Sequence, residues 1–414
     1  MERLRKIGFS KLTRLEDALE KLFNTIKSMS NEEIETSMAL NRILGENIIS
    51  GMDAPPFDRA AMDGYAIIAE NSFGASPKNP KKIKKIGQIE IGEVSELRLN
   101  KGEAIRISTG AAIPEGCDAV IKIENTEIEG DIITLYDSLV PGKNISKRGE
   151  DIIAGTDVLS EGIEIKAEQI ALLSSLGFKT VKVRTKPKIS VFSVGDELVE
   201  VGESLQKNKI YNSNTPMIAN LVETYGGEVL DQATLKDDKE SLKKNLLNAT
   251  EKSEIVVFTG GTSVGTKDLL PEILNENGTV LTHGIAMRPG SPVLIGQVNN
   301  RIVFCLPGTP VAAYICFLKI VGLAIRKMLG CIELDPRKKI IAEINNDVPV
   351  SGLGALNFLR VKMKREEDKI IAFPIRLRGS GVLTSLTQSD GIVEIKPNQE
   401  GLKKGELVVV DLFP

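Results

Sequence analysis

The chain has 414 residues, of which 42% are hydrophobic, a composition typical of a folded protein with about two to four domains. Lys and Arg number 53 against 56 Asp and Glu, so the net charge of -3 gives no electrostatic support for nucleic acid as the main partner. The single histidine, His283, excludes a histidine-rich zinc site, and we interpret it as structural.

Cysteine spacing and hydropathy indicate the cellular compartment in which the protein is expected, the cytoplasm. The four cysteines show no C-x-x-C spacing, which argues against a disulfide framework or a zinc ribbon and favours a reducing environment. The charged N-terminus is not followed by the apolar core of a signal peptide. The longest apolar run, residues 311–325, is broken by Lys319 and is shorter than the ~18 residues that suggest a membrane span. We therefore expect a cytoplasmic protein without a membrane partner, and a buried helix at this run.

A helical and linker domain is predicted for residues 1–50 and 150–186. Thr13 and Glu16 have the spacing of a capping box, and a stripe of helical period follows them. The stripe consists of Leu15, Ala18, Leu19, Leu22 and Phe23. It predicts a helix that packs against a core or another subunit. A second short helix is predicted over residues 167–176.

The rest of the chain predicts an α/β plus β fold. Residues 51–149 alternate short β-rich runs with Gly and Pro, which indicates a small β module. Residues 187–333 alternate strands with helices, a pattern typical of a doubly wound α/β ligand domain with a parallel-type sheet. Residues 334–414 return to short β runs and predict a C-terminal β-barrel. Within the α/β domain, strands are expected at 188–194, 229–235, 254–258 and 301–306, and helices at 216–225, 239–250 and 310–329.

Residues suited to ligand binding follow three of these strands. Gly195 to Glu197 follow the first strand, Thr259 to Asp268 follow another, and Pro307 to Pro310 follow the last. Because ligands of open α/β sheets bind at the carboxyl ends of the strands, we expect the three segments to meet at one sheet edge.

The segment from Gly260 to Gly265 is the most informative of the three. Its glycines, Gly260, Gly261 and Gly265, allow positive φ angles and a close approach of backbone N–H groups to an anion. The hydroxyls of Thr262 and Ser263 add hydrogen-bond donors. The loop nearly matches a P-loop, but its last two residues are swapped to Thr-Lys, which excludes a standard P-loop NTPase.

Carboxylates and one arginine complete the expected site. Glu197, Asp268 and either Asp237 or Asp238 follow strand ends, and such hard oxygen ligands suit a Mg²⁺ ion that bridges phosphate oxygens. One member of the Asp237-Asp238 pair is expected to cap the following helix instead. Arg288, in Arg-Pro-Gly-Ser-Pro, is a further anion contact because its guanidinium offers a rigid fork of donors.

Nine stretches in order along the chain resemble the molybdopterin molybdenumtransferase family, which includes the gephyrin E domain. Together they span almost the whole sequence, and the series is far more specific than a glycine-rich loop alone. They are PPFDRAAMDGYA (55–66), IRISTGAAIPEGCDAV (105–120), KRGEDIIAGTDVL (147–159), VFSVGDEL (191–198), IYNSNTPM (210–217), FTGGTSVGTKD (258–268), RPGSP (288–292), LPGTPVAA (306–313) and GSGVLTSL (379–386).

The resemblance implies four domains and a homodimer, in which the β module of one chain faces the α/β domain of the other. It implies an enzyme of molybdenum cofactor biosynthesis that inserts molybdate into adenylylated molybdopterin, with Mg²⁺, and releases AMP. Contact with the upstream adenylyltransferase is a further implied partnership.

The resemblance also assigns residues to roles. Asp63 and Thr109 of the β module, with Asp268, would be catalytic, and Asp63 would orient a group or accept a proton. Glu197, Asp237 and Asp268 would hold the metal. The binding residues for cofactor and oxyanion would be Ser193, Gly195, Asn214, Gly260, Gly261, Thr262, Ser263, Gly265, Arg288, Pro307, Arg360 and Ser385.

Two departures from the family pattern leave alternatives open. Ser291 stands where a lysine is common, and Thr266-Lys267 stand where an acidic residue is common. We hypothesise that Lys267 partly replaces the missing positive charge. Tungstate could replace molybdate because the two oxyanions share charge and shape. A molybdopterin adenylyltransferase and a non-catalytic scaffold are the other readings. The β module and barrel argue against the former, and the clustered carboxylates against the latter.

Overall fold

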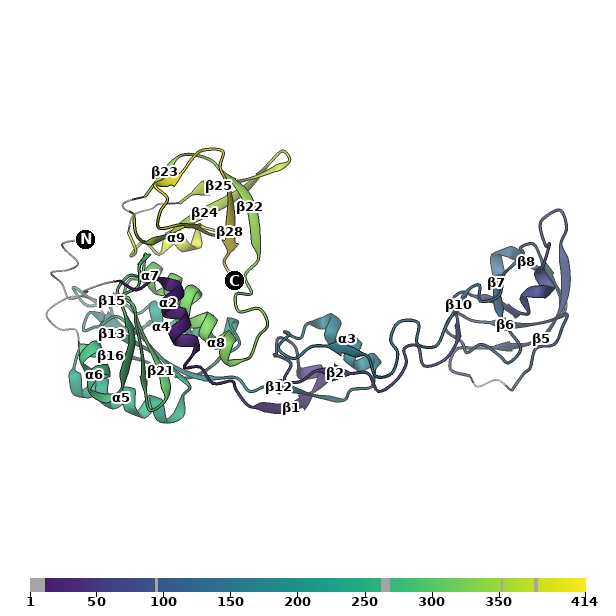
Figure 1. Ribbon diagram of the computed structural model, residues 1–414, viewed down its shortest axis with the longest axis horizontal. Helices are drawn as coiled ribbons and strands as arrows, with labels where there is room; N and C mark the ends of the chain where they lie inside the picture. Colours follow the sequence, from purple (N-terminus) through teal and green to yellow (C-terminus); the bar gives the residue numbers. More distant parts are fainter. Residues whose placement is uncertain (1–11, 94–95, 262–268, 351–352, 376–378) are drawn as a thin grey trace. The chain divides into compact units, whose positions relative to one another are not determined.

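The structure is a computed structural model that describes residues 12–93, 96–261, 269–350, 353–375 and 379–414 (Figure 1). Contacts between residues divide the chain into two compact units. The first unit comprises the described parts of Met1–Gly45, Gly162–Lys166 and Val181–Pro414, and the second comprises those of Glu46–Glu161 and Ala167–Thr180. The four-domain boundaries expected from sequence are finer than this division and stay a prediction.

A six-stranded sheet forms the centre of the first unit, in the order β16-β13-β17-β21-β20-β18. The first four strands run parallel, as the sequence predicts, whereas β20 and β18 add an antiparallel edge. The strands are β13 (Lys188–Val194), β16 (Glu228–Leu235), β17 (Ile255–Thr259), β18 (Thr279–His283), β20 (Leu294–Val298) and β21 (Arg301–Leu306).

Helices cover both faces of this sheet because its central strands are apolar on both sides. Val257 packs in the core shared with α2, α4, α7 and α8, whereas its neighbour Val256 packs with α5 and α6. The helices are α2 (Leu15–Phe23), α4 (Asn214–Thr224), α5 (Lys239–Lys252), α6 (Leu269–Asn277), α7 (Pro310–Cys316) and α8 (Gly322–Met328). The doubly wound α/β prediction is confirmed.

The start of α2 differs from the sequence prediction. The helix begins at Leu15, and its N-cap, Arg14, makes no side-chain capping bond. Thr13 instead extends a backbone ladder: its N–H donates to the Gly284 carbonyl at 3.0 Å and its carbonyl accepts from the Ala286 N–H at 2.8 Å. The predicted capping box is therefore wrong, because a long-range backbone pairing holds Thr13 outside the helix.

A closed barrel of five strands follows in the first unit. Its order is β24-β25-β22-β28-β26, and the β24–β26 pairing closes it. The strands are β22 (Lys339–Ile344), β24 (Leu356–Glu366), β25 (Lys369–Pro374), β26 (Gly391–Ile395) and β28 (Leu407–Leu412). The short strand β19 (Met287–Arg288) pairs in parallel with the start of β24, which ties the loop after β18 to the barrel.

The second unit contains a curled six-stranded sheet in the order β7-β4-β6-β5-β9-β8. Only β5 and β6 run parallel among these neighbours. Tyr65 and Ala66, adjacent on β4, belong to hydrophobic clusters on opposite faces. The strands are β4 (Gly64–Ile67), β5 (Lys81–Ile89), β6 (Glu103–Ile107), β7 (Ala119–Lys122), β8 (Thr126–Glu129) and β9 (Ile132–Leu135).

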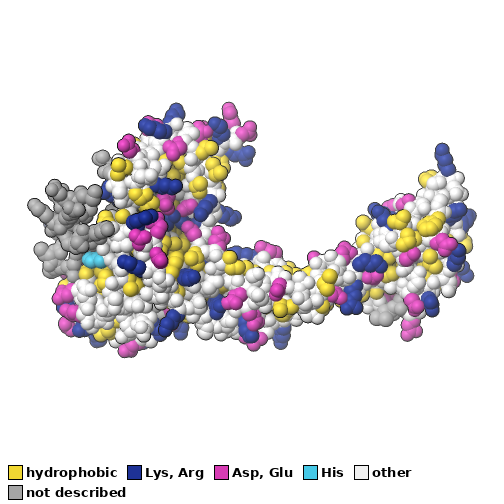
Figure 2. Space-filling view, viewed as in Figure 1, with side chains coloured by type: hydrophobic (Ala, Val, Ile, Leu, Met, Phe, Trp, Pro, Cys, Tyr) yellow, Lys and Arg dark blue, Asp and Glu magenta, His cyan; other side chains and the backbone are white. Residues whose placement is uncertain are grey.

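Shorter elements complete the chain, among them the expected helix α3 (Ala167–Ser175). The two-stranded ladders are β1 (Asn31–Glu35) with β12 (Thr180–Arg184), β2 (Ile48–Ile49) with β11 (Asp157–Leu159), β3 (Arg59–Ala60) with β10 (Ile145–Ser146), β14 (Leu198–Val199) with β15 (Ile210–Tyr211), and β23 (Val348–Pro349) with β27 (Gly401–Leu402). Acidic and basic side chains are interspersed on the visible face (Figure 2). Over the described ranges, no helix is long and apolar enough to cross a membrane.

Candidate functional site

The ends of β13, β17 and β21 meet at one edge of the central sheet, as the sequence predicts. The Gly260 N–H donates to the Leu306 carbonyl at 3.0 Å, and the Gly195 N–H donates to the Leu235 carbonyl at 3.1 Å. A Cβ atom at Gly260 would lie 2.3 Å from the Val194 carbonyl oxygen, so only glycine allows this backbone approach. The three segments thus form one continuous backbone surface.

The glycine loop begins with the backbone geometry that its sequence predicts. Gly260 and Gly261 have φ angles of 86° and 64°, in the left-handed region that favours glycine. The other predicted residues of this loop, Thr262, Ser263 and Gly265, lie outside the described residues. Asp268, predicted as catalytic and metal-binding, and Lys267 also lie outside them.

Ser193 lies beneath this edge in a chain of buried hydroxyl groups. Its side chain is 1% exposed, and its Oγ lies 2.8 Å from Thr215 Oγ1 and 2.9 Å from Thr259 Oγ1. Asn212 joins the same network by donating from Nδ2 to Thr215 Oγ1 and to Thr234 Oγ1, both at 2.8 Å. Hydroxyl contacts therefore link the strands below the glycine loop to the start of α4, and a fully satisfied buried network is rigid.

Asn214 is the first residue of α4 and faces the loop after β21. Its side chain is 7% exposed, and its Nδ2 donates to the Gly308 carbonyl at 2.8 Å. Among the residues that the structure describes, its buried Oδ1 has no hydrogen-bond partner. Pro307, the preceding loop residue, is buried. Asn214 thus fixes the third strand end and offers an acceptor at the sheet edge.

The carboxylates of this edge separate into two roles. Asp238 is the N-cap of α5, where its Oδ2 accepts from the Ser241 N–H at 2.8 Å, so it is the capping member of the pair. Asp237 donates its N–H to Asp196 Oδ1 at 3.3 Å, which brings its loop to the end of β13. The Glu197 carboxylate folds back beside Gly195, where an added Cβ would lie 2.6 Å from Glu197 Oε2.

These donors are oxygens of the kind that Mg²⁺ prefers. Among the described residues, no group of three or more His, Cys, Asp or Glu side chains is placed to hold a metal ion. The described side chains alone therefore do not form a metal site, and the assignment of Glu197, Asp237 and Asp268 to a metal stays a prediction.

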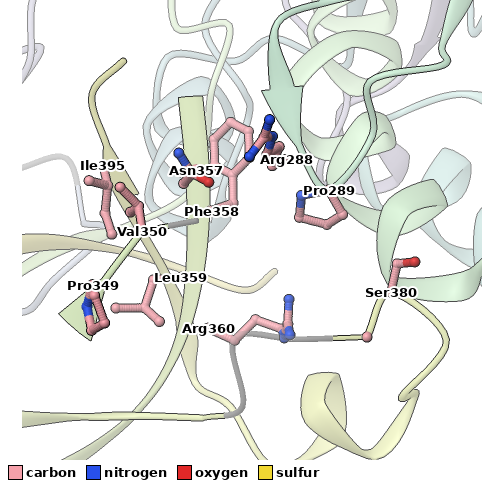
Figure 3. A pocket seen from close by; sticks show the side chains of 11 residues that line it. Arg288, Pro289, Pro349, Val350, Asn357, Phe358, Leu359, Arg360, Ser380 and Ile395 are labelled. Atoms are coloured by element: carbon pink, nitrogen blue, oxygen red, sulfur yellow. The ribbon is translucent and has the colours of Figure 1, made fainter. Parts of the chain in front are cut away.

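Two arginines line a cavity of about 430 Å³ between the loop around β19 and the barrel, which we term the arginine pocket (Figure 3). Arg288 and Pro289 come from the loop around β19, Phe358 and Arg360 from β24, and Ser380 from the segment before the short helix α9 (Thr384–Thr387). The Arg360 side chain is 3% exposed, and burial lowers the pKa of its guanidinium. The structure thus brings the predicted Arg288 and Arg360 together.

Two nearby serines have local hydrogen bonds. Ser385, on α9, is 2% exposed and donates from Oγ to the Val382 carbonyl at 2.6 Å. Ser291 donates from Oγ to the Met287 carbonyl at 2.6 Å and so closes the turn that carries Arg288. The serine at the position where the family often has lysine therefore shapes the loop.

In the second unit, Asp63 and Thr109 are direct neighbours at one end of the β4–β6 ladder. Asp63 Oδ1 accepts from the Thr109 N–H at 2.8 Å and from Thr109 Oγ1 at 3.0 Å. These hydrogen bonds, the backbone bond first, lower the pKa of Asp63 below its usual value. Asp63 is therefore an exposed carboxylate that is ionised at neutral pH.

Sequence reasoning missed a second carboxylate beside this pair. Glu90 accepts a hydrogen bond from Ser108 Oγ at 2.7 Å and another from Gln88, and these bonds lower its pKa. The parallel register of β5 and β6, which pairs Ile89 with Ile107, brings Glu90 to Ser108. No local pattern in the sequence signals this pairing.

The single histidine belongs to the first unit. His283 is the last residue of β18, at the antiparallel edge of the sheet. Burial lowers the pKa of its imidazole, which favours the neutral form. This position agrees with the structural interpretation from sequence, which stays a prediction.

The hydroxyl of Thr109 supplies one of the two bonds that hold the pKa of Asp63 low. We predict that Thr109→Val raises the pKa of Asp63, because the charged form loses one donor while the backbone donor remains. Carbon-detected NMR titration of the carboxyl groups would measure this. Ser108→Ala is the matched control and should raise the pKa of Glu90 instead. An Asp63 titration that is the same in Thr109→Val and the unmodified chain would contradict the prediction.

Comparisons with known proteins cover nearly the whole chain. The MoeA N-terminal region (domain I and II) matches residues 13–177, the probable molybdopterin binding domain matches residues 190–327, and the MoeA C-terminal region (domain IV) matches residues 350–413. A molybdopterin molybdenumtransferase of Staphylococcus aureus is 34% identical over 96% of this chain and 95% of its own length.

Solved structures agree with these matches. Crystal structures of molybdopterin biosynthesis MoeA proteins from Pyrococcus horikoshii give TM-scores of 0.83 and 0.86, with 38% and 34% sequence identity. They are covered over their full length and cover 98% and 97% of this chain. With matches to all three regions and a relative above 30% identity over nearly its full length, the chain belongs to the MoeA family of molybdopterin molybdenumtransferases, enzymes of molybdenum cofactor biosynthesis.

Proposed function

We propose that this chain inserts molybdate into adenylylated molybdopterin and releases AMP, giving the molybdenum cofactor. The observation that carries the proposal is the arginine pocket, in which Arg288 and a buried Arg360 line one cavity. Two guanidinium groups of this kind suit a small divalent oxyanion, because each presents a planar fork of N–H donors.

Burial makes Arg360 a stronger anion contact than a surface arginine. Removal of water from the guanidinium lowers its pKa, yet an arginine stays protonated in proteins, so its charge is retained at neutral pH. In surroundings of low dielectric constant, the attraction between this charge and an entering oxyanion is less screened. Arg288, which is half-buried, would supply a second contact from the loop around β19.

The sheet edge suits the phosphate-containing part of the substrate. The backbone N–H groups from Gly260 to Gly265 would approach phosphate oxygens, since glycine permits this close approach. Gly195 and Asn214 would border the same ligand, and Ser193, buried beneath them, would hold the strand ends in place. Pro307 and Ser385 stay candidates for the oxyanion region on the strength of the family resemblance.

Positioning and charge neutralisation are sufficient for this reaction, without a protein nucleophile. Glu197, Asp237 and Asp268 would hold a Mg²⁺ ion, which when bound would neutralise charge on the phosphoanhydride. Asp63, ionised and fixed by Thr109, would orient a reacting group or accept a proton. The protein's residues thus bind, orient and hold charge around the bond to AMP.

The sequence also left three alternatives open: an adenylyltransferase, a scaffold and a tungstate-using enzyme. An adenylyltransferase would account for residues 190–327 and would leave the matches at residues 13–177 and 350–413 without a role. A scaffold would not require two arginines at one cavity. Tungstate shares the charge and shape of molybdate, so it forms a second arm of the experiment below.

We predict that Arg360→Ala weakens molybdate-dependent release of AMP, with KM for molybdate raised about tenfold to a hundredfold for the loss of a charge-assisted contact. Arg288→Ala should act in the same direction. Arg365→Ala is the matched control, because Arg365 lies on the same strand but is exposed. The assay uses adenylylated molybdopterin with molybdate or tungstate and quantifies AMP by chromatography.

Two outcomes of that assay would count against the proposal. Equal AMP release with and without oxyanion would contradict the proposed transferase function. An unchanged KM for molybdate in both Arg360→Ala and Arg288→Ala would exclude the arginine pocket as the oxyanion site. Turnover with tungstate alone would keep the site and change its substrate.

We predict that chelation with EDTA stops AMP release and that added Mg²⁺ restores it. Glu197→Gln should raise the Mg²⁺ concentration that is required, because it removes one charged oxygen ligand. Glu203→Gln, an exposed change in the same loop region, is the control. Full activity after chelation would exclude the metal, and an unchanged Mg²⁺ requirement in Glu197→Gln would exclude this ligand.

The proposed enzyme is a cytoplasmic homodimer that contacts the upstream adenylyltransferase. The family resemblance supports the dimer, and the four free cysteines agree with a reducing compartment. Analytical ultracentrifugation of the chain, alone and with the adenylyltransferase, tests both associations. A monomer at micromolar concentration would contradict the dimer, and separate sedimentation of the two enzymes would contradict their contact.

A further inference from the structure

Lys319 interrupts the longest apolar run of the sequence, and the function proposed above does not use it. The residue lies in the π-helical turn η4 (Phe317–Val321), which separates α7 from α8, and it is only 8% exposed. A π turn inserts an extra residue into a helix and so redirects the side chains around it. A buried lysine at such a turn calls for a physical explanation, since burial of an ammonium group is costly unless it is paired.

The ammonium group of Lys319 contacts three adjacent strands of the barrel. Its Nζ lies 3.0 Å from Asp411 Oδ2 on β28 and 3.3 Å from Glu394 Oε2 on β26. It also lies 5.3 Å from the ring centroid of Phe358 on β24, a cation–π distance. One cation from the helical layer thus holds β24, β26 and β28 together at their outer face.

The register of the barrel places Arg360 on that same face. Phe358 pairs with Glu394, and two residues further along Arg360 pairs with Ile392, which in turn pairs with Asp411. Because residues directly opposite in antiparallel strands share a face and alternate residues of a strand do too, Phe358 and Arg360 point to the same side. Both residues line the arginine pocket.

A second cation supports the carboxylate that Lys319 uses. Arg337 Nη2 lies 3.1 Å from Asp411 Oδ2, and Arg337 also pairs with Asp335 at 2.6 Å. Asp411 therefore bridges two cations, and loss of Lys319 would leave it paired with Arg337. This arrangement makes substitution of Lys319 an informative experiment, because no carboxylate is left buried without a cation.

We propose that Lys319 is a positioning residue for oxyanion binding: it fixes the barrel face that carries Phe358 and Arg360 against the layer that carries Arg288. The proposal rests on the proposed function of the arginine pocket. Lys319 acts through Phe358, Glu394 and Asp411, and it has no contact with the oxyanion itself. Without Lys319, Arg288 and Arg360 are both still present, but the distance between them is no longer fixed, and the affinity for the oxyanion falls.

The test measures binding of sodium molybdate alone to the full chain by isothermal titration calorimetry, together with AMP release. Lys319→Met, which keeps the length of the side chain without its charge, should raise the Kd for molybdate about tenfold, since a small misplacement of binding groups has effects of this size or larger. KM for molybdate should rise in parallel, with kcat at saturating molybdate changed less than about twofold. Lys319→Arg should restore most of the affinity.

Lys239→Met is the matched control. Lys239 also pairs with two carboxylates, Glu272 and Glu276, at 2.8 and 2.7 Å, but it lies on α5, on the opposite face of the sheet. This variant should bind molybdate like the unmodified chain. Glu394→Gln serves as the milder second variant, because it removes one charge from the cluster while Asp411 still pairs with Lys319.

The outcomes separate this inference from the proposed function. If Arg360→Ala weakens molybdate binding while Lys319→Met and Glu394→Gln leave it unchanged, Lys319 has no positioning role. If Lys319→Met fails to fold by circular dichroism, Glu394→Gln decides: a raised Kd supports the role, and an unchanged Kd overturns it. If Arg360→Ala binds molybdate normally, the oxyanion site is elsewhere, and the role of Lys319 falls with the proposed function.

Discussion

Met287 and Arg288 pair in parallel with Leu356 and Asn357 at the start of β24, and this short ladder joins the loop after β18 to the barrel. Without it, the loop that carries Arg288 would lose its backbone connection to the strand that carries Arg360. Backbone pairing sets position to within a hydrogen-bond length, whereas a loop alone would leave the arginine free to move. Backbone pairing therefore positions the two arginines of the pocket, and their charges can act together only because of this arrangement.

Burying charged groups at this junction has a cost in folding free energy that their ion pairs must offset. Lys319 and Arg337 are both nearly buried, and removing ions from water is repaid only when their geometry is good and their partners are complete. The bridging carboxylate of Asp411 provides such partners for both cations. Apolar residues at these positions would fill the junction with less penalty. Through Asp411, the buried ions connect the helical turn that carries Lys319 and the segment that carries Arg337 to strand β28.

Local sequence features allowed prediction of much of the α/β layer. The apolar runs of β13, β17 and β21, the glycines at their ends and a helix cap from the Asp237-Asp238 pair each depend on neighbouring residues, so they could be predicted from sequence. Which of the two aspartates forms the cap was decided only by the structure. Pairings between residues far apart in the chain could not be predicted from the sequence. Thr13 pairs with Ile285 instead of capping α2, β20 and β18 form an antiparallel edge, and β5 runs parallel to β6. Each of these is decided by a partner far along the chain.

The same distinction applies to the candidate site. Arg288 and Arg360 were identified separately, through a motif and a family resemblance, and only tertiary structure brings them to one cavity. Glu90 beside Ser108, and Lys319 beside Phe358, carry no motif at all. Residues that touch a ligand are found by chemistry in the sequence, whereas residues that hold them in place are found by contacts.

Ser291 makes the buried arginine more important in this chain than a comparison with the family suggests. The family often has a lysine at this position, but the Ser291 hydroxyl is engaged with the Met287 carbonyl and closes the turn. The loop around β19 therefore contributes one cation, Arg288, where two are common. Under the function that we propose, a divalent oxyanion would depend more on Arg360, whose desolvated charge would compensate for the smaller number of cations. The main determinant of oxyanion affinity would then lie on β24, and the groups that hold β24 in position would contribute to it.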